Sequence, residues 1–89
     1  MELAAREACN YIKADVFSNC HDTNNPDGVA VSHYFYRCVN DYCGTLAYYS
    51  NNNEERRKTQ EVRDLEAVRC TTFAAYSKEC ANRQIILFW

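Results

Sequence analysis

The sequence has no excess of positive charge: ten lysines and arginines stand against twelve aspartates and glutamates in 89 residues, giving a formal net charge of −2. A protein that holds phosphates needs a positive field, so this composition argues against nucleic acid as a partner. Long apolar runs are also missing. The longest covers only residues 85–89, far short of the roughly 20 residues that cross a bilayer. We therefore expect no membrane span in this chain.

A secretory leader and a glycosylation sequon are missing as well. Met1 is followed by polar, helix-favouring residues rather than by a basic start and an apolar stretch, so we take Met1 as an expression start or an excision point. No Asn-x-Ser/Thr triplet occurs, so the segment offers no acceptor for N-glycosylation. No internal repeat or linker divides the chain, and we expect a single domain over residues 1–89.

Cysteine, in contrast, is abundant, with six residues at positions 9, 20, 38, 43, 70 and 80. An even number in a short chain is typical of a disulfide framework. A domain of this size buries only about 60 to 65% of the surface of its unfolded chain, so its core alone is marginal. Each disulfide adds roughly 2 to 4 kcal/mol of stability. We therefore expect a secreted, extracellular protein, and this expectation depends on the cysteines alone.

The spacing of apolar residues predicts a mainly α, three-helix domain stapled by disulfides. Apolar side chains recur every three or four positions from Leu3 to Cys20, as on one helical face, with a bend near Asp15. The turn-forming residues 24–28 then end this helix, and Gly28 is expected to take a positive φ angle there.

A second helix begins at its predicted cap, Ser32, and ends at Gly44. Its buried stripe is Phe35, Cys38, Val39 and Tyr42.

Residues 50–64 contain a single aliphatic residue among balanced charges, which predicts an exposed insertion that is helical in part at most. From Leu65 the helical period returns. It continues through Val68, Arg69, Thr72, Phe73, Tyr76 and Cys80, with Lys78 and Arg83 near the carboxyl end, where cations complement the helix dipole. The β-branched and aromatic residues Ile85–Trp89 predict a short strand or an extended tail.

Two functional alternatives, a zinc site and a cysteine nucleophile, are weaker than a structural role. A zinc site could use Cys20, His21 and His33, but no Cys-x-x-Cys occurs and the adjacent Cys20 and His21 would point to different helix faces. We expect His21 to be packed or capping. A cysteine nucleophile needs a free thiol, which an even count disfavours.

Acidic and aromatic side chains that could act in catalysis or binding also have structural interpretations. The acidic residues Asp22, Asp27 and Asp41 lack the apolar setting that separates the pKa values of an acid and a base. The aromatic residues beside the cysteines are interpreted as packing around disulfides rather than as a stacking surface. We expect no enzyme, no metal and no cofactor.

Three segments carry a family resemblance: AREACNYIKADVFSNCHD (5–22), YFYRCVNDYCGT (34–45) and VRCTTFAAYSKECANRQIILFW (68–89). The matching features are a Phe three residues before Cys-His, an aromatic about four before Cys38, Asp41 two before Cys43, Ala75-Tyr76 ahead of Cys80, and the closing Trp89. The chain resembles the eight-cysteine domain that adjoins the von Willebrand D domain in von Willebrand factor, gel-forming mucins, zonadhesin and tectorins. Thr45 and Val68 stand where that family usually has two further cysteines, and Gln84 stands where it often has glycine.

The resemblance implies two disulfides, Cys9 with Cys38 and Cys20 with Cys80. It leaves Cys43 for Cys70, although in relatives the residue matching Cys43 can pair outside this segment. In some relatives, cysteines in this neighbourhood link chains covalently, and the absent cysteines at 45 and 68 put such linkage in doubt. Spacing alone allows 15 pairings.

The implied function is that of a non-catalytic structural module of a large extracellular protein of mucin-like, adhesive, clotting or matrix type. It would support a preceding von Willebrand D domain and contact a following trypsin-inhibitor-like domain of the same chain, with Ile85, Ile86, Leu87, Phe88 and Trp89 as the interdomain contact. An oligomer of the parent protein is a further expectation. The alternative is a free-standing secreted cysteine-rich factor or toxin that binds a receptor.

Overall fold

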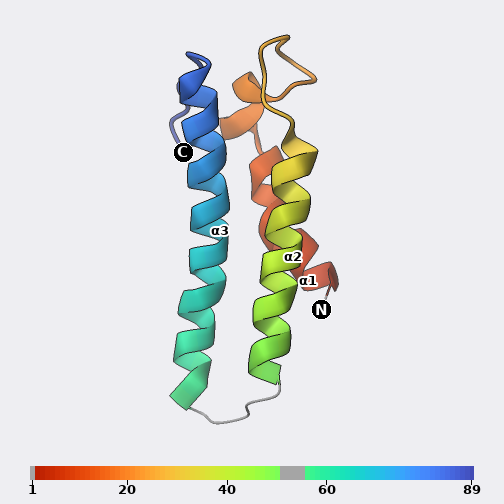
Figure 1. Cartoon of the computed structure of the whole chain (residues 1–89), viewed down its shortest axis with the longest axis vertical. Helices are drawn as coiled ribbons and strands as arrows, with labels where there is room; N and C mark the ends of the chain where they lie inside the picture. Colours follow the sequence, from red (N-terminus) through yellow and green to blue (C-terminus); the bar gives the residue numbers. More distant parts are fainter. Residues whose placement is uncertain (1, 51–55) are drawn as a thin grey trace.

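The computed structural model describes residues 2–50 and 56–89, and Figure 1 shows that they form a helical fold. The elements in chain order are α1 (Glu2–Cys9), the 3-10 helices η1 (Asn10–Lys13) and η2 (Asp15–Cys20), α2 (Val31–Ser50) and α3 (Arg56–Asn82). Apart from an isolated bridge between His21 and Val29, the described residues contain no β-structure. The predicted mainly α class is confirmed.

The first predicted helix is broken into three pieces. The α-helix ends at Cys9, and two 3-10 helices follow, separated at Ala14, whose backbone is extended with ψ at 161°. The bend expected near Asp15 is therefore a break one residue earlier. The break changes the phase of the apolar face, so that Phe17 is buried while Val16 remains 41% exposed.

Helix α2 continues six residues beyond Gly44, where the sequence pattern predicted its end. Glycine in a helix interior costs about 1 kcal/mol relative to alanine. The residues beyond Gly44 offset this cost by packing, because Tyr49 is only 7% exposed. The helix begins at Val31, one residue before the predicted cap Ser32.

Helix α3 begins at Arg56 rather than at Leu65, so the described part of the predicted insertion over residues 50–64 is helical. Ser50 belongs to α2 and residues 56–64 belong to α3, while residues 51–55 lie outside the described part of the chain. Lys58, Thr59 and Gln60 are exposed, as the low apolar content predicted, but Asp64 is partly buried.

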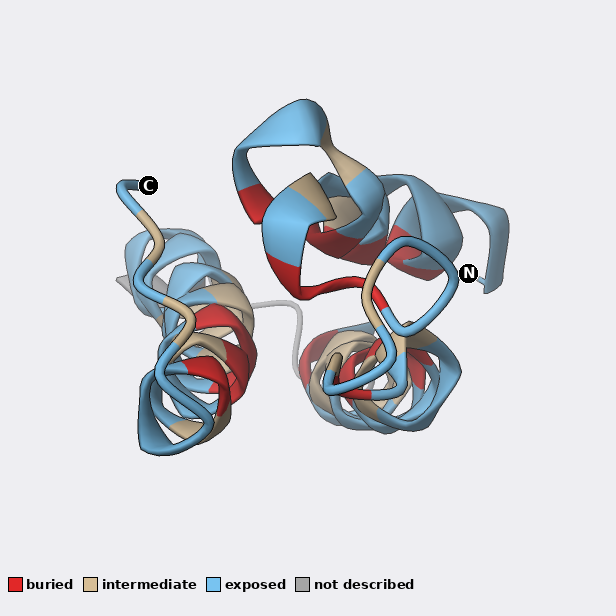
Figure 2. Cartoon of the chain, turned by 90° about the horizontal axis from the view of Figure 1, so that it is seen from above, coloured by how far each residue is buried: buried red, intermediate tan, exposed pale blue. Residues whose placement is uncertain are grey.

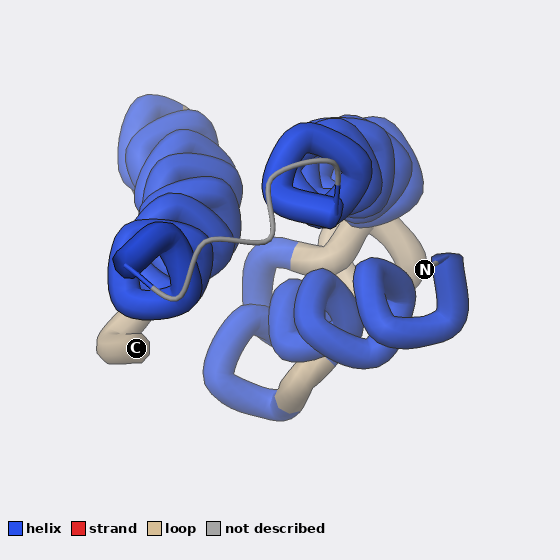
Figure 3. The backbone as a smooth tube through the Cα atoms, turned by 90° about the horizontal axis from the view of Figure 1, so that it is seen from below, coloured by secondary structure: helices blue, strands red, loops and turns tan. Residues whose placement is uncertain are grey.

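Helices α2 and α3 lie side by side as a long antiparallel hairpin, and α1 with the two 3-10 helices packs across one side of it, mainly against α2 (Figures 1, 2 and 3). Buried residues, red in Figure 2, lie on the faces where these layers meet. The core consists of Ala5, Cys9, Ile12, Phe17, Cys20, Val29, Phe35, Cys38, Val39, Phe73, Tyr76 and Cys80. The helical spacing predicted most of these residues.

Two disulfides cross between the layers. Cys9 bonds to Cys38 and joins α1 to α2, and Cys20 bonds to Cys80 and joins η2 to α3. These are the two pairs that the family resemblance implied. They close loops of 29 and 60 residues, and the loss of chain entropy in the unfolded state makes each worth about 4 kcal/mol.

Candidate functional site

Neither a metal site nor a thiol–histidine pair is assembled around Cys20 and His21. Cys20 is in a disulfide, and the buried His21 has its Nε2 atom 2.9 Å from the carbonyl oxygen of Ile12. His33 packs its ring edge-on against Tyr34. Within residues 2–50 and 56–89, no three His, Cys, Asp or Glu side chains lie close enough to hold a metal ion. His21 is a packed histidine, as predicted.

The buried Tyr76 fixes α3 to the segment between η2 and α2. Its hydroxyl lies 2.9 Å from the carbonyl oxygen of Val29 and 3.1 Å from that of Cys20. Burial is the main cause that raises the pKa of Tyr76 to about 12, because an ionised phenolate would lose its hydration there. The sequence pattern placed Tyr76 in the core, but it did not indicate these two acceptors.

Two arginines of α3 also bond to distant backbone carbonyls. The Nε–H of Arg69 donates to the carbonyl oxygen of Ala8 at 2.9 Å, at the end of α1. Arg83 was expected to complement the helix dipole. Its Nη1 atom instead donates to the carbonyl oxygens of Gly28 at 3.0 Å and Asp27 at 3.3 Å. The helical spacing of apolar residues gives no indication of such long-range contacts.

The carboxyl-terminal tail begins with a Schellman turn. The Ile85 amide donates to the Cys80 carbonyl and the Gln84 amide to that of Ala81, both at 2.9 Å. Gln84 takes a φ of 64°, the left-handed conformation that usually belongs to glycine at this position.

The tail then alternates between the core and solvent. Ile85 and Leu87 pack against the core cluster, whereas Ile86 is 60% and Phe88 is 88% exposed. Trp89 is 46% exposed, and its ring packs against Phe17 at 5.8 Å between ring centroids. The exposed set is therefore Ile86 and Phe88, one of the two alternatives that an extended segment allows.

An aromatic cluster extends this apolar surface toward η1. The rings of Trp89 and Tyr11 both contact Phe17 and Phe73, with centroid separations between 5.4 and 6.2 Å. Phe17 and Phe73 are buried, while Tyr11 is 38% exposed. We call Tyr11, Ile86, Phe88 and Trp89 the tail surface. The buried rings of Phe17 and Phe73 pack against Tyr11 and Trp89 and hold these two side chains in place.

The expected Cys43–Cys70 disulfide is not formed, and both cysteines are free. The reason is the orientation of the two helices about their own axes, which decides which residues face the partner helix. The facing surfaces of α2 and α3 include Thr45 and Val68, and neither cysteine lies among them. Cys43 packs at the edge of the core cluster and Cys70 is exposed on α3. A bond between them would need both helices to turn about their axes.

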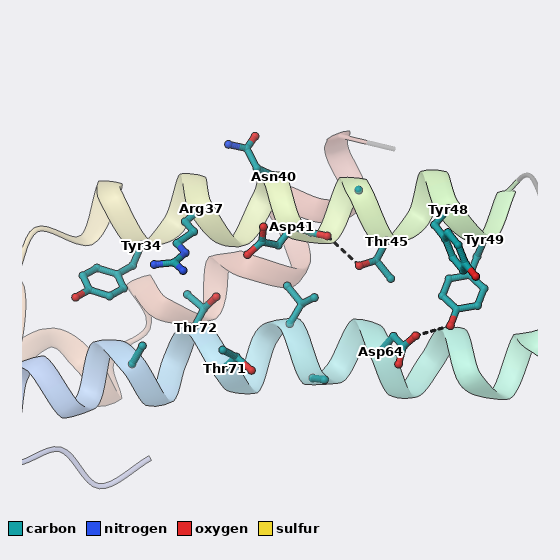
Figure 4. Close-up of a pocket in the computed structure, with 14 residues that line it drawn as sticks. Tyr34, Arg37, Asn40, Asp41, Thr45, Tyr48, Tyr49, Asp64, Thr71 and Thr72 are labelled. Carbon is teal, nitrogen blue, oxygen red and sulfur yellow. Dashed lines mark hydrogen bonds between the residues drawn. The ribbon is translucent and has the colours of Figure 1, made fainter.

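An open groove of about 620 Å³ lies between the facing surfaces of α2 and α3 (Figure 4). Thr45 and Val68, at the two positions where the resembling family carries extra cysteines, lie on its opposite walls. The Thr45 hydroxyl instead donates to the Asp41 carbonyl of its own helix at 3.0 Å.

Farther along the groove, the Tyr49 hydroxyl donates to the Asp64 carboxylate and joins the two helices (Figure 4). Hydrogen bonds from Tyr49 and Gln60 hold the pKa of Asp64 below its usual range.

Comparison with known proteins gives a family and one relative. The model of the C8 domain family matches residues 8–89. The chain is 29% identical over all of its 89 residues to SCO-spondin of Rattus norvegicus, of which it spans 1%. It therefore corresponds to a very small part of that protein. No solved structure matches the chain.

Proposed function

The chain belongs to the C8 domain family, and on that basis we propose that it is a non-catalytic structural module of a large extracellular multidomain protein. The family match over residues 8–89 supports the module, and a relative of which the chain spans only 1% supports the large parent. No helix among the described residues is long and apolar enough to cross a membrane. Disulfides between its layers suit an oxidising, extracellular location.

We propose further that the tail surface is the contact to a neighbouring domain of the parent chain, with a von Willebrand D domain or a trypsin-inhibitor-like domain as the neighbour. The single observation that carries this proposal is Phe88, an aromatic side chain 88% exposed beside Ile86 at 60%. A patch of large apolar side chains in water marks an interaction site. An alternating tail leaves one set of side chains for a partner while the other set anchors it.

The two free cysteines fit the same function. In an oxidising compartment an exposed thiol such as Cys70 pairs with a cysteine elsewhere. We propose that Cys70 and Cys43 bond to cysteines outside residues 1–89, within neighbouring domains of the parent chain. The rival function, a free-standing factor or toxin, is less supported, because a full-length match to a small part of a much longer protein favours a module.

The experiment compares the isolated domain with the same domain joined to its neighbours in the parent sequence. The isolated domain should bind a hydrophobic dye and self-associate weakly, and the neighbours should abolish both effects. The variant Phe88→Ser should remove dye binding from the isolated domain. Leu3→Ser is the matched control, because Leu3 is equally apolar and 71% exposed but lies on α1. Equal dye binding with and without the neighbours would contradict the proposal.

A further inference from the structure

The groove between α2 and α3 has the size of a ligand pocket. Its volume of about 620 Å³ falls within the roughly 300 to 1,000 Å³ that small-molecule sites occupy. Tyrosines with partners of their own stand at its two ends. Tyr34 packs its ring against Tyr76 with 5.1 Å between ring centroids, and Tyr49 donates to Asp64 at the other end (Figure 4). The capacity of the groove to bind a ligand therefore lies in the residues between these ends.

Thr72, on the α3 wall, is a buried residue whose hydroxyl has no partner. The residue is 6% exposed, and its hydroxyl forms no hydrogen bond within the described part of the chain. Every fully enclosed side-chain nitrogen or oxygen of the described residues does have a partner, so this hydroxyl must reach the open groove. Figure 4 shows the side chain pointing from α3 toward α2. A buried hydroxyl is normally hydrogen-bonded, so its partner has to come from the groove itself.

Arg37 and Asp41 present opposite charges on the α2 wall. They are about 6 Å apart along the helix axis, and both side chains line the groove and point into it (Figure 4). Neither forms an ion pair with the other or with any residue of 2–50 and 56–89. A cation four residues before an anion is in the less favourable order for pairing on a helix. Both charges are therefore available to a ligand.

These groups together match a sugar that carries one carboxylate. The planar guanidinium of Arg37 can bind a carboxylate through two parallel hydrogen bonds. The ionised Asp41 only accepts hydrogen bonds, so the part of the ligand beside it needs donors, which ring hydroxyls provide. The Thr72 hydroxyl both donates and accepts, as a sugar hydroxyl does. Because the α2 wall carries one charge of each sign, a singly charged ligand fits it better than a doubly charged phosphate.

We propose that the groove is a binding site for an acidic sugar, a hexuronate or a sialate, with Arg37 on the carboxylate and Asp41 and Thr72 on ring hydroxyls. Small residues of the two walls, Gly44 and Ala67 among them, let the ring approach the helix backbones. An apolar partner helix fits less well, because it would remove water from the two charges without pairing them. The groove is separate from the tail surface, so this proposal can fail while the interdomain contact holds, and the reverse.

The test titrates the isotope-labelled chain with methyl β-D-glucuronide and, in a second arm, with the methyl glycoside of N-acetylneuraminic acid, and follows the NMR shifts. We expect saturable shifts at the Arg37 Nε–H and the Thr72 amide, and the sugar that binds more tightly identifies the source. Methyl β-D-glucoside lacks the carboxylate. It should bind about tenfold more weakly than the glucuronide, because it loses the charge-assisted hydrogen bonds.

Three variants test the individual contacts. Arg37→Gln should weaken binding of the acidic sugar about tenfold. Thr72→Val should weaken it about threefold without lowering the melting temperature, because the hydroxyl has no partner within the described residues. Asp41→Asn should weaken the sugar but strengthen the binding of acetate, which no longer meets a like charge. Arg63→Gln is the matched control, because Arg63 is an exposed arginine that does not line the groove.

Four results would overturn the proposal. The first is equal binding of the glucoside and the glucuronide, since the carboxylate would then not be recognised. The second is acetate binding as tightly as the acidic sugars, since the hydroxyls would then contribute nothing. The third is the absence of saturable shifts with either acidic sugar at the highest soluble concentration. The fourth is an equal loss of affinity in Arg37→Gln and Arg63→Gln, which would indicate an unspecific effect of charge.

Discussion

The Tyr76 hydroxyl lies 2.9 Å from the carbonyl oxygen of Val29, 47 residues away in sequence. The same hydroxyl bonds to Cys20, the residue whose side chain is bonded to Cys80, one turn farther along α3. One side of α3 is thus joined to the segment before α2 by a covalent bond and by a buried hydroxyl. This junction fixes the end of the hairpin from which the carboxyl-terminal tail leaves.

Replacing Tyr76 by Phe should destabilise the domain by about 1 to 2 kcal/mol, because the Val29 carbonyl oxygen loses the hydroxyl donor while the ring still fills its place. The Cys20 carbonyl oxygen keeps the Val29 amide as a donor. The measurement is urea denaturation. Tyr11→Phe is the control, because Tyr11 is partly exposed and contributes through its ring contacts. Its stability should be unchanged. An equal effect of the two substitutions would mean that the Tyr76 hydroxyl contributes nothing specific.

Alkaline pH should weaken the fold through the same residue. The pKa of Tyr76 is about 12 in the folded domain, whereas a tyrosine in an unfolded chain titrates near pH 10. The folded state therefore keeps a proton that the unfolded state loses, so the stabilisation is complete below about pH 10 and is lost as the pH rises toward about 12. The stability difference between wild type and Tyr76→Phe should shrink across this window. A constant difference would show that Tyr76 titrates normally.

Replacing Gln84 by Gly should stabilise the domain by about 0.5 to 1 kcal/mol. Gln84 has a φ of 64°, and a side chain in the left-handed region costs about 1 to 2 kcal/mol, part of which the greater entropy of unfolded glycine cancels. Gln84→Ala keeps the strain and serves as the control. The measurement is the melting temperature of the wild type and the two variants. Equal melting temperatures of the glycine and alanine variants would rule out backbone strain at this position.

The two glycines should respond to alanine in opposite directions. A Cβ atom at Gly28 would lie 2.6 Å from the Cys20 carbonyl oxygen and 2.7 Å from that of His21, so Gly28→Ala should destabilise by about 1 to 3 kcal/mol through overpacking. A Cβ atom at Gly44 meets nothing within 4 Å, so Gly44→Ala should stabilise α2 by about 0.5 to 1 kcal/mol. The measurement is the denaturation midpoint of each variant. A raised midpoint for Gly28→Ala would contradict the close approach, and a lowered midpoint for Gly44→Ala would contradict the open space.

The helical periods predicted the core well, because burial repeats with the helix. Phe35, Cys38 and Val39 on α2 are buried, as are Phe73 and Tyr76 on α3. The ends of the helices were harder to predict from the sequence, because tertiary packing decides where a helix ends. Gly44 does not stop α2, because the turns beyond it bury Tyr49. The φ of Gly28 is not positive, and it is the close approach of two carbonyl groups that requires glycine there.

The candidate site was predicted in part. The sequence predicted all five residues 85–89 as the interdomain contact, whereas Ile85 and Leu87 pack against the core and Ile86 and Phe88 are the most exposed of the five. The disulfide that the family resemblance left for Cys43 and Cys70 is not formed, because the resemblance does not show how the two helices are rotated about their axes. The contribution of Tyr11 to the tail surface was missed, since it depends on the 3-10 turn that follows Cys9.

Hydroxyl-radical footprinting of Phe88 tests the interdomain account most directly. The measurement compares the labelling rate of Phe88 in the isolated domain with its rate in the parent protein. We predict rapid labelling in the isolated domain, in agreement with its 88% exposure, and strong protection in the parent. Equal labelling of Phe88 in the two proteins would contradict the account, because the tail surface would then face solvent in both.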